Sequence, residues 1–337
     1  MATIGVIGAG SWGTALAKML AESGHDVTLW AHRVEVARDI AAHGENASYL
    51  PGFALPVTLR ATADLAEGVS GKEVLLSVSP SHVVRDVMTE AMRHVTGRPY
   101  VVTASKGIEE TSLLTMAGVL EEIVGTLLAG GVCALSGPSF AREVAAHMPT
   151  AVTVGARDHA VSTVVQRIFT TNYFRVYSSD DLIGVEIGGA VKNVIAIAAG
   201  VSDGLGFGSN TRAALITRGI AETARLGAAM GANPTTLSGL AGLGDLVLTC
   251  TGELSRNRTV GVRLGRGEAL ESILGSMKMV AEGVRNTRSV RALAAKVGVE
   301  MPITEQMYAM LYENKSPRDV VTELMARGLK PEFNRAG

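Results

Sequence analysis

The sequence contains 337 residues, of which 47% are hydrophobic and 19% charged, and its formal net charge is -1. This composition predicts a folded globular chain of about two domains and excludes a mainly disordered protein. The near-zero net charge gives no general attraction for nucleic acid or an anionic membrane, so a phosphate ligand would need a local binding site.

The cysteines and the most apolar segment indicate a cytoplasmic protein without a membrane span. Cys133 and Cys250 lie far apart and outside any CxxC motif, so neither a disulfide framework nor a zinc site is expected. The first residues lack the pattern of a secretory signal, because glycines interrupt their apolar stretch. Residues 182–201 are strongly apolar but contain Glu186 and Lys192, which favours a buried helix over a membrane span.

Strand-like and helix-like stretches alternate through the first half of the chain. A strand at 3–8 is followed by a helix at 12–23, a strand at 26–32 and a helix from about Val34. Further apolar strands are expected at 73–79, 100–105, 132–136, 150–155 and 173–179. Uniformly apolar strands separated by helices predict a doubly wound α/β sheet of the Rossmann type, with parallel strands covered on both faces.

The pattern changes at Asp180, after which long helical stretches follow and no convincing strand appears. We therefore expect an N-terminal α/β domain over residues 1–179 and a C-terminal all-α-helical domain over residues 180–337. Asp180 and Asp181 are expected to lie at the start of the first helix of the second domain, where its dipole favours negative charge.

Three glycines, Gly8, Gly10 and Gly13, form a GxGxxG motif between the first strand and the first helix. Glycine-rich turns are common, but here the motif lies inside a compact βαβ unit. In this context one glycine makes the tight turn, the second lets the backbone approach a pyrophosphate, and the third allows close helix packing. The free N–H groups of the helix then face the diphosphate, which predicts a dinucleotide-binding domain.

The residues after the second strand indicate which dinucleotide binds. An NAD-selective site usually has an acidic residue there, whereas this sequence has His32 and Arg33. A guanidinium can pair with a ribose 2′-phosphate, so NADP(H) is favoured and NAD(H) is the alternative. His32 and Arg33 could also be ordinary solvated loop residues. Trp12, inside the motif, would shield the coenzyme or simply pack.

Two loops follow later strands of the same sheet. Lys106, in TASKGIE, comes directly after a strand, where open parallel sheets bind their ligands. In LSGPSFARE, Pro138 and Ser139 are suited to the opening of a helix, and Gly137 precedes them. The backbone N–H groups of this segment could orient a substrate, although each residue taken singly would suit an ordinary helix cap.

Lys192 lies in the middle of the apolar helix IGGAVKNVIAIAAG. A lysine in such a helix must reach solvent, form a pair, or stay buried with a lowered pKa. A lysine of lowered pKa is a candidate acid or base for interconversion of a carbonyl and an alcohol. Gly188, one turn earlier on the same face, is expected to leave room for a ligand beside the ammonium.

A third cluster, GLAGLGDLVLTCTGELSRNR, combines Asp245 with a short polar run. Arg256 offers a fork for a phosphate, and Ser255 and Asn257 add neutral donors. Asp245 could accept a hydrogen bond from a substrate hydroxyl or pair with Lys192. Arg258 is expected on the solvated surface, and the scattered histidines give no support for a metal site.

Six motifs in this order, GAGSWGTALA, SKGIE, SGPSFAREV, AVKNVIAIAAG, GLGDLVLTC and SRNR, resemble bacterial NAD(P)-dependent glycerol-3-phosphate dehydrogenase over about residues 2–330. The resemblance implies reduction of dihydroxyacetone phosphate to sn-glycerol 3-phosphate for glycerophospholipid synthesis, in a cytoplasmic homodimer, with Lys192 as proton donor and acceptor. The coenzyme contacts it implies are Ser11, Trp12, His32, Arg33, Lys106, Ala141, Arg256, Val280 and Glu282. The substrate contacts it implies are Lys106, Gly137, Ser139, Lys192, Asp245, Ser255, Arg256 and Asn257.

Two other functions fit parts of the pattern. A β-hydroxyacid dehydrogenase shares the nucleotide domain and a helical lysine, but its substrate carries a carboxylate, whereas the SRNR run favours a phosphate. A non-catalytic NADPH sensor needs only the fold and the glycine motif. Such a sensor would have no need for Lys192, Asp245 and Arg256 together.

Overall fold

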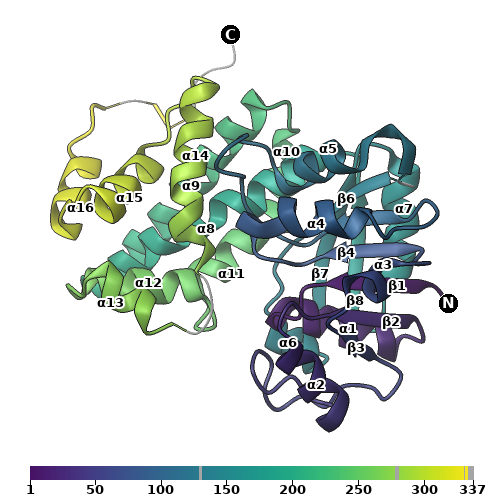
Figure 1. Cartoon of the computed structure of the whole chain (residues 1–337). Coiled ribbons are helices and arrows are strands. Elements are labelled where there is room, and N and C mark those ends of the chain that lie inside the picture. Colours follow the sequence, from purple (N-terminus) through teal and green to yellow (C-terminus); the bar gives the residue numbers. More distant parts are fainter. Residues whose placement is uncertain (129–130, 278–280, 330, 333–337) are drawn as a thin grey trace.

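The computed structural model describes residues 1–128, 131–277, 281–329 and 331–332. It contains an α/β unit and a helical unit, which lie side by side in Figure 1. The strands are β1 (Thr3–Ile7), β2 (Asp26–Trp30), β3 (Arg60–Thr62), β4 (Val74–Ser77), β5 (Tyr100–Thr103), β6 (Gly131–Ser136), β7 (Thr150–Ala156) and β8 (Phe174–Ser179). The helices of the first unit are α1 (Ser11–Glu22), α2 (Val34–His43), α3 (Leu65–Val69), α4 (Val84–Met92), α5 (Met116–Leu128), α6 (Ala141–Ala145) and α7 (His159–Phe169), with a 3-10 turn η1 (Ser81–Val83).

The helical unit follows β8 directly. Its elements are α8 (Leu182–Gly204), α9 (Ser209–Ala229), α10 (Pro234–Leu237), the π-helical turn η2 (Leu240–Gly244), α11 (Asp245–Thr251), α12 (Arg256–Gly265), α13 (Leu270–Gly275), α14 (Glu282–Lys296), α15 (Pro302–Tyr312) and α16 (Pro317–Met325). No strand occurs among the described residues after Ser179, and the predicted fold class is confirmed. The domain boundary at residue 180 stays a prediction.

The strands form one sheet in the order β3-β2-β1-β4-β5-β6-β7-β8. Strands β1 to β6 run parallel, so their carboxyl ends meet at one edge. The expectation of an all-parallel sheet is wrong at one place, because β7 pairs antiparallel with β6 and β8 follows the direction of β7. The strand β3, which sequence analysis missed, has only three residues and no apolar run.

Helices cover both faces of the sheet, as predicted. One face packs against α1, α2 and α7 through residues such as Leu16, Ile40 and Phe169. The opposite face packs against α3, α4 and α5 through residues such as Met88 and Leu120. The sheet is therefore a buried layer, and its free edges and loops remain for ligand binding.

Helix α8 is the centre of the helical unit (Figure 1). Asp181 caps it by accepting a hydrogen bond from the Gly184 N–H at 2.8 Å, which confirms the expected acidic start. The helix is long and apolar enough to cross a membrane, but 83% of its most apolar window is buried inside the protein. An apolar helix surrounded by other helices is the expected core of a globular domain.

Four glycines let α8 and α12 cross with their backbones in contact. A Cβ at Gly200 would lie 2.1 Å from the Arg258 carbonyl oxygen, and one at Gly261 would lie 2.1 Å from the Ile197 carbonyl oxygen. Gly204 and Gly265 meet the partner helix in the same way one turn further along. This crossing places the first turn of α12 beside the middle of α8.

A buried carboxylate connects two helices of the same unit. Glu222 of α9 accepts hydrogen bonds from the N–H groups of Ile303 at 2.7 Å and Thr304 at 3.4 Å, at the start of α15. Burial raises the pKa of Glu222 to about 7, despite these two hydrogen bonds. The unfolded chain ionises near 4.5 instead, so folding favours the protonated acid between these values.

We predict that the stability of the Glu222→Gln variant, relative to that of the natural chain, increases as the pH rises. An acid whose pKa is higher in the folded than in the unfolded chain lowers the free energy of unfolding as the pH rises between the two pKa values, here from about pH 4.5 to about pH 7. The Tm of the variant relative to the natural chain should therefore increase from pH 5 to pH 8 in thermal unfolding. The exposed Glu271→Gln is the matched control, and an equal Tm difference at both pH values would contradict the prediction.

Candidate active site

The glycine motif has the geometry of a phosphate-binding turn. Gly8 has a φ of +125°, and a Cβ there would lie 2.9 Å from the backbone of Val78. A Cβ at Gly13 would lie 1.9 Å from the Gly8 carbonyl oxygen, so this glycine allows close packing of α1. Around Gly10, in contrast, the described residues leave open space, and no side chain caps the helix that follows. The first turn of α1 is thus open to an anion, as expected for a pyrophosphate.

The end of β2 presents two basic side chains. His32 and Arg33 are exposed, and Arg33 donates a hydrogen bond to the Tyr49 hydroxyl at 2.7 Å while its guanidinium lies over the Tyr49 ring. The Tyr49 carbonyl accepts a hydrogen bond from Ser11 Oγ at 2.6 Å. Tyr49, which sequence analysis missed because it stands in a loop without a motif, connects the glycine turn with Arg33.

Trp12 is half-buried, and its ring lies 6.5 Å from that of Phe174. It packs in a small cluster with Ala141 at the start of α6, which brings two predicted coenzyme contacts together. A helix follows the Gly137–Pro138–Ser139 segment as expected, but α6 begins at Ala141 with Phe140 at its N-cap, so Pro138 and Ser139 do not occupy its opening positions. Both residues lie in the loop before the helix, where Ser139 Oγ donates to the Gly137 carbonyl at 3.0 Å.

Asp245 joins two lysines in the interior of the molecule. Its Oδ2 accepts a hydrogen bond from Lys106 Nζ at 2.6 Å, and its Oδ1 accepts one from Lys192 Nζ. Lys106 follows β5, Lys192 lies in the middle of α8, and Asp245 is the first residue of α11. Lys192 and Asp245 are both buried, so of the alternatives left open for the lysine of the apolar helix, the structure shows an ion pair inside the protein.

Burial and charge determine the pKa values of this group. Burial is the main cause that lowers the pKa of Lys192 to about 8, and Asp245 partly opposes this decrease. For Asp245, burial alone would raise the pKa, but the ammonium groups of Lys106 and Lys192 hold it below its ordinary value. Lys192 can therefore gain and lose a proton near neutral pH, which general acid-base chemistry requires.

The expected ligand space beside Gly188 is filled by protein. A Cβ at Gly188 would lie 2.3 Å from the Ala241 carbonyl oxygen, so this glycine accommodates the turn η2 and leaves no room for a ligand. The prediction is wrong because η2, a segment that follows α8 only after α9 and α10, packs against this face of the helix. Asp245, directly after η2, pairs with Lys192 across 53 positions of the chain. Gly188 instead lets η2 approach α8 and bring Asp245 to Lys192.

The first turn of α12 lies beside Lys192. Asn257 Nδ2 donates to Asn193 Oδ1 at 2.9 Å, and Asn257 Oδ1 accepts from the Gly283 N–H at 2.9 Å. Ser255 caps the helix by accepting from the Arg258 N–H at 3.2 Å. Asn257 thus connects α8, α12 and α14, and the second N–H of its amide has no acceptor among the residues that the structure describes.

Arg256 and Arg258 differ in their surroundings. Arg256 is exposed and forms no hydrogen bond or ion pair with any residue that the structure describes, although nearby protein atoms lower its pKa by desolvation. The expectation that Arg258 is merely solvated is wrong, because it pairs with the half-buried Asp203 at 2.7 Å. Arg256 is therefore the arginine of this run that can meet an anion.

Glu282 is the first residue of α14 and contacts the other unit. Its carboxylate accepts hydrogen bonds from Ser81, in the turn after β4, which sequence analysis did not single out. Val280, another predicted coenzyme contact, lies outside the described residues.

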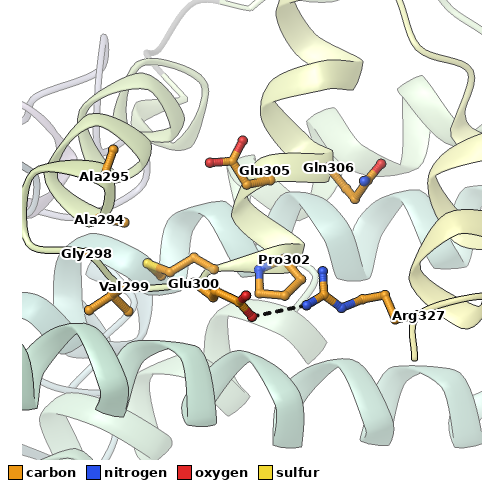
Figure 2. A pocket seen from close by; sticks show the side chains of 10 residues that line it. Ala294, Ala295, Gly298, Val299, Glu300, Pro302, Glu305, Gln306 and Arg327 are labelled. Atoms are coloured by element: carbon orange, nitrogen blue, oxygen red, sulfur yellow. Dashed lines mark hydrogen bonds and ion pairs between the residues drawn. The ribbon is translucent and has the colours of Figure 1, made fainter. Parts of the chain in front are cut away.

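A separate hollow of about 360 Å³ lies where α14 ends and α15 begins (Figure 2). Its side chains include Pro302, and an ion pair of 3.2 Å joins Glu300 and Arg327 across it. None of the predicted site residues lines this hollow. Lys106, Lys192, Asp245 and Asn257 lie elsewhere, at the carboxyl edge of the sheet beside α8, α11 and α12.

Comparisons with known proteins agree with this arrangement. Residues 3–162 match the family model of the NAD-dependent glycerol-3-phosphate dehydrogenase N-terminus, and residues 181–322 match that of its C-terminus. The chain is 59% identical to the glycerol-3-phosphate dehydrogenase (NAD(P)+) of Citrifermentans bemidjiense, over 98% of both chains. It is 55% identical to that of Anaeromyxobacter dehalogenans, over 97% of this chain and 99% of the relative.

A solved structure shows the same likeness. The crystal structure of glycerol-3-phosphate dehydrogenase from Coxiella burnetii superposes with a TM-score of 0.91 at 43% identity, covering 97% of this chain and 99% of that chain. The likeness extends over both units of the fold.

We predict that Asp245→Asn destabilises the protein most at low pH. Without the carboxylate the buried ammonium of Lys192 is left beside the half-buried ammonium of Lys106, and loss of one partner of a buried ion pair costs about 3–5 kcal/mol. Because the pKa of Lys192 then falls further below about 8, the lysine loses its proton more readily and the deficit shrinks from pH 6 to pH 8.5. Urea unfolding of the variant and the natural chain at both pH values measures this deficit in the free energy of unfolding. The exposed Glu305→Gln is the control, and a pH-independent deficit would refute the prediction.

Proposed function

Because the chain belongs to the NAD-dependent glycerol-3-phosphate dehydrogenase family, its activity is the NAD(P)H-dependent reduction of dihydroxyacetone phosphate to sn-glycerol 3-phosphate, and we propose that Lys192 is its catalytic acid and base. The observation that carries the residue assignment is the buried group of Lys192, Asp245 and Lys106 beside the first turn of α12. Beside this group, whose Lys192 has its pKa lowered to about 8, lies the exposed Arg256, which has no ion-pair partner among the described residues.

The coenzyme fits the turn that the glycines make. Gly8, Gly10 and Gly13, with the N–H groups of Ser11 and Trp12, would hold its pyrophosphate, since open space surrounds Gly10. His32 and Arg33 would hold the adenosine ribose, and the further proposed contacts are Lys106, Ala141, Arg256, Val280 and Glu282. When bound, the reduced nicotinamide supplies a hydride for the ketone carbon.

The substrate phosphate is proposed to bind at the start of α12. Arg256 provides the charge, and among the described residues neither the Ser255 Oγ proton nor the second N–H of the Asn257 amide has an acceptor, so both could donate to the phosphate. The helix N-terminus adds its own attraction for an anion. Gly137, Ser139 and Lys106 would border the rest of the substrate, after β5 and β6.

Lys192 is proposed to give its proton to the oxygen that becomes the alcohol. Asp245 holds the ammonium in place and prevents burial from lowering its pKa further. In the opposite direction neutral Lys192 accepts the hydroxyl proton. Reduction therefore needs the protonated lysine and oxidation needs the neutral one.

The coenzyme preference, the oligomeric state and the cellular role of the protein are further proposals. We propose that NADP(H) is preferred over NAD(H), because Arg33 is exposed and held in orientation by Tyr49. A cytoplasmic homodimer whose product supplies glycerophospholipid synthesis is proposed from the sequence resemblance.

We expect the purified protein to oxidise NADPH only when dihydroxyacetone phosphate is present. Lys192→Ala should lower kcat by about 10²- to 10⁴-fold, because the proton donor is lost, while the Kd of NADPH stays nearly constant. The kcat of reduction should also fall as the pH rises through about 8, and that of oxidation should rise.

Lys296→Ala, at an exposed position of α14, is the control for this experiment. Unchanged turnover in Lys192→Ala would refute the assignment of the catalytic residue. Turnover of short oxo-acids in place of the triose phosphate would favour a β-hydroxyacid dehydrogenase. Binding of NADPH without any oxidation would favour a sensor.

Arg33→Ala should change the coenzyme preference. Loss of a charged hydrogen bond to the 2′-phosphate should raise the KM of NADPH about tenfold, with little change in the KM of NADH. Steady-state kinetics with both coenzymes measure the ratio of the KM of NADPH to the KM of NADH. Arg38→Ala, an exposed arginine on α2, is the matched control, and an equal increase for both coenzymes would show that Arg33 does not read the 2′-phosphate.

A further inference from the structure

Ser81 and Glu282 join the two units of the fold at the proposed active site. Ser81 Oγ donates to Glu282 Oε2 at 2.6 Å, and the Ser81 N–H donates to Glu282 Oε1 at 3.3 Å. Ser81 follows β4 at the carboxyl edge of the sheet, and Glu282 is the first residue of α14. One buried serine therefore engages both oxygens of the carboxylate.

The contact belongs to a close-packed junction beside Lys106. A Cβ at Gly107 would lie 2.8 Å from both Ser81 Cβ and Asn286 Oδ1, so three segments meet there. Asn286 Nδ2 in turn donates to the Lys106 carbonyl at 3.4 Å. The orientation of Glu282 is thus fixed by groups that adjoin a residue of the ion-paired centre.

Glu282 also acts on Arg256. The two residues directly precede Gly283 and Asn257, and the Gly283 N–H donates to Asn257 Oδ1 at 2.9 Å, so the starts of α12 and α14 lie together. In this arrangement the negative charge of Glu282 opposes the desolvation that lowers the pKa of Arg256. The carboxylate nevertheless bonds to Ser81, and no hydrogen bond or ion pair joins Arg256 to Glu282 in the described structure. If the carboxylate turned to Arg256, it would compete with any phosphate for the guanidinium.

We propose that Ser81 is a positioning residue that holds the Glu282 carboxylate at the end of β4 and thereby keeps Arg256 available for the phosphate of the substrate. This inference rests on the proposed role of Arg256. Ser81 itself touches neither the reacting atoms nor the phosphate. Its hydrogen bonds keep the Glu282 carboxylate on Ser81 and away from Arg256.

The proposal is tested by removing the hydroxyl. Ser81→Ala should raise the KM of dihydroxyacetone phosphate and the Ki of inorganic phosphate about fivefold or more, with a much smaller change in kcat at saturation. Ser81→Thr keeps the hydroxyl and should restore both constants. In the Glu282→Gln background, Ser81→Ala should have no further effect, because a neutral amide competes weakly for a guanidinium.

Ser112→Ala is the matched control, since Ser112 Oγ makes the same kind of bond to Glu109 at 2.5 Å outside the site. Unchanged KM and Ki in Ser81→Ala would overturn the proposal, as would an equal effect in the Glu282→Gln background. A loss of kcat and Tm without a change in KM would show a structural role only. Calorimetric titration of inorganic phosphate into the NADP+ complex measures the effect of Ser81→Ala on phosphate binding without any turnover. Failure of the natural chain to turn over the triose phosphate would overturn the proposed function and not the role of Ser81.

Discussion

The carboxylate of Asp245, shared by the ammonium groups of Lys106 and Lys192, is the interaction on which the site depends. A buried lysine without a partner would lose its proton or destabilise the fold, whereas this carboxylate keeps the pKa of Lys192 at about 8. Two ammonium groups and one carboxylate also leave one net positive charge, which suits an anionic substrate. The same interaction ties β5 of the sheet to α8 and α11 of the helical unit.

The packing of α8 brings the other groups to this centre. Gly188 lets η2 approach until Asp245 reaches Lys192, and Gly200 and Gly261 let α12 cross in backbone contact. The first turn of α12 then lies where Asn257 bonds to Asn193. A larger side chain at any of these glycines would separate elements that hold opposite sides of the site, so the glycines around α8 serve the chemistry through packing.

Sequence patterns predicted which residues and elements form this site better than they predicted how those elements pack together. The apolar runs predicted every strand except the short β3, and the position of Lys192 in an apolar helix left an ion pair as one of three alternatives, with Asp245 as a possible partner. The antiparallel direction of β7 escaped prediction, because an apolar strand has the same composition in either direction. The space beside Gly188 and the bond between Ser81 and Glu282 depend on segments distant in the chain, and no local periodicity records such contacts.

The site divides its positive charge between residues with different tasks. A guanidinium keeps its proton at every physiological pH, so Arg256 can hold a phosphate but cannot serve as an acid. An ammonium changes its pKa readily on burial, and Lys192 is buried whereas Arg256 is exposed. Exchanging the two residue types would leave the total charge unchanged and remove the proton transfer. With the roles proposed for them, the two positions need different cations, because Lys192 would have to exchange a proton and Arg256 would have to stay charged.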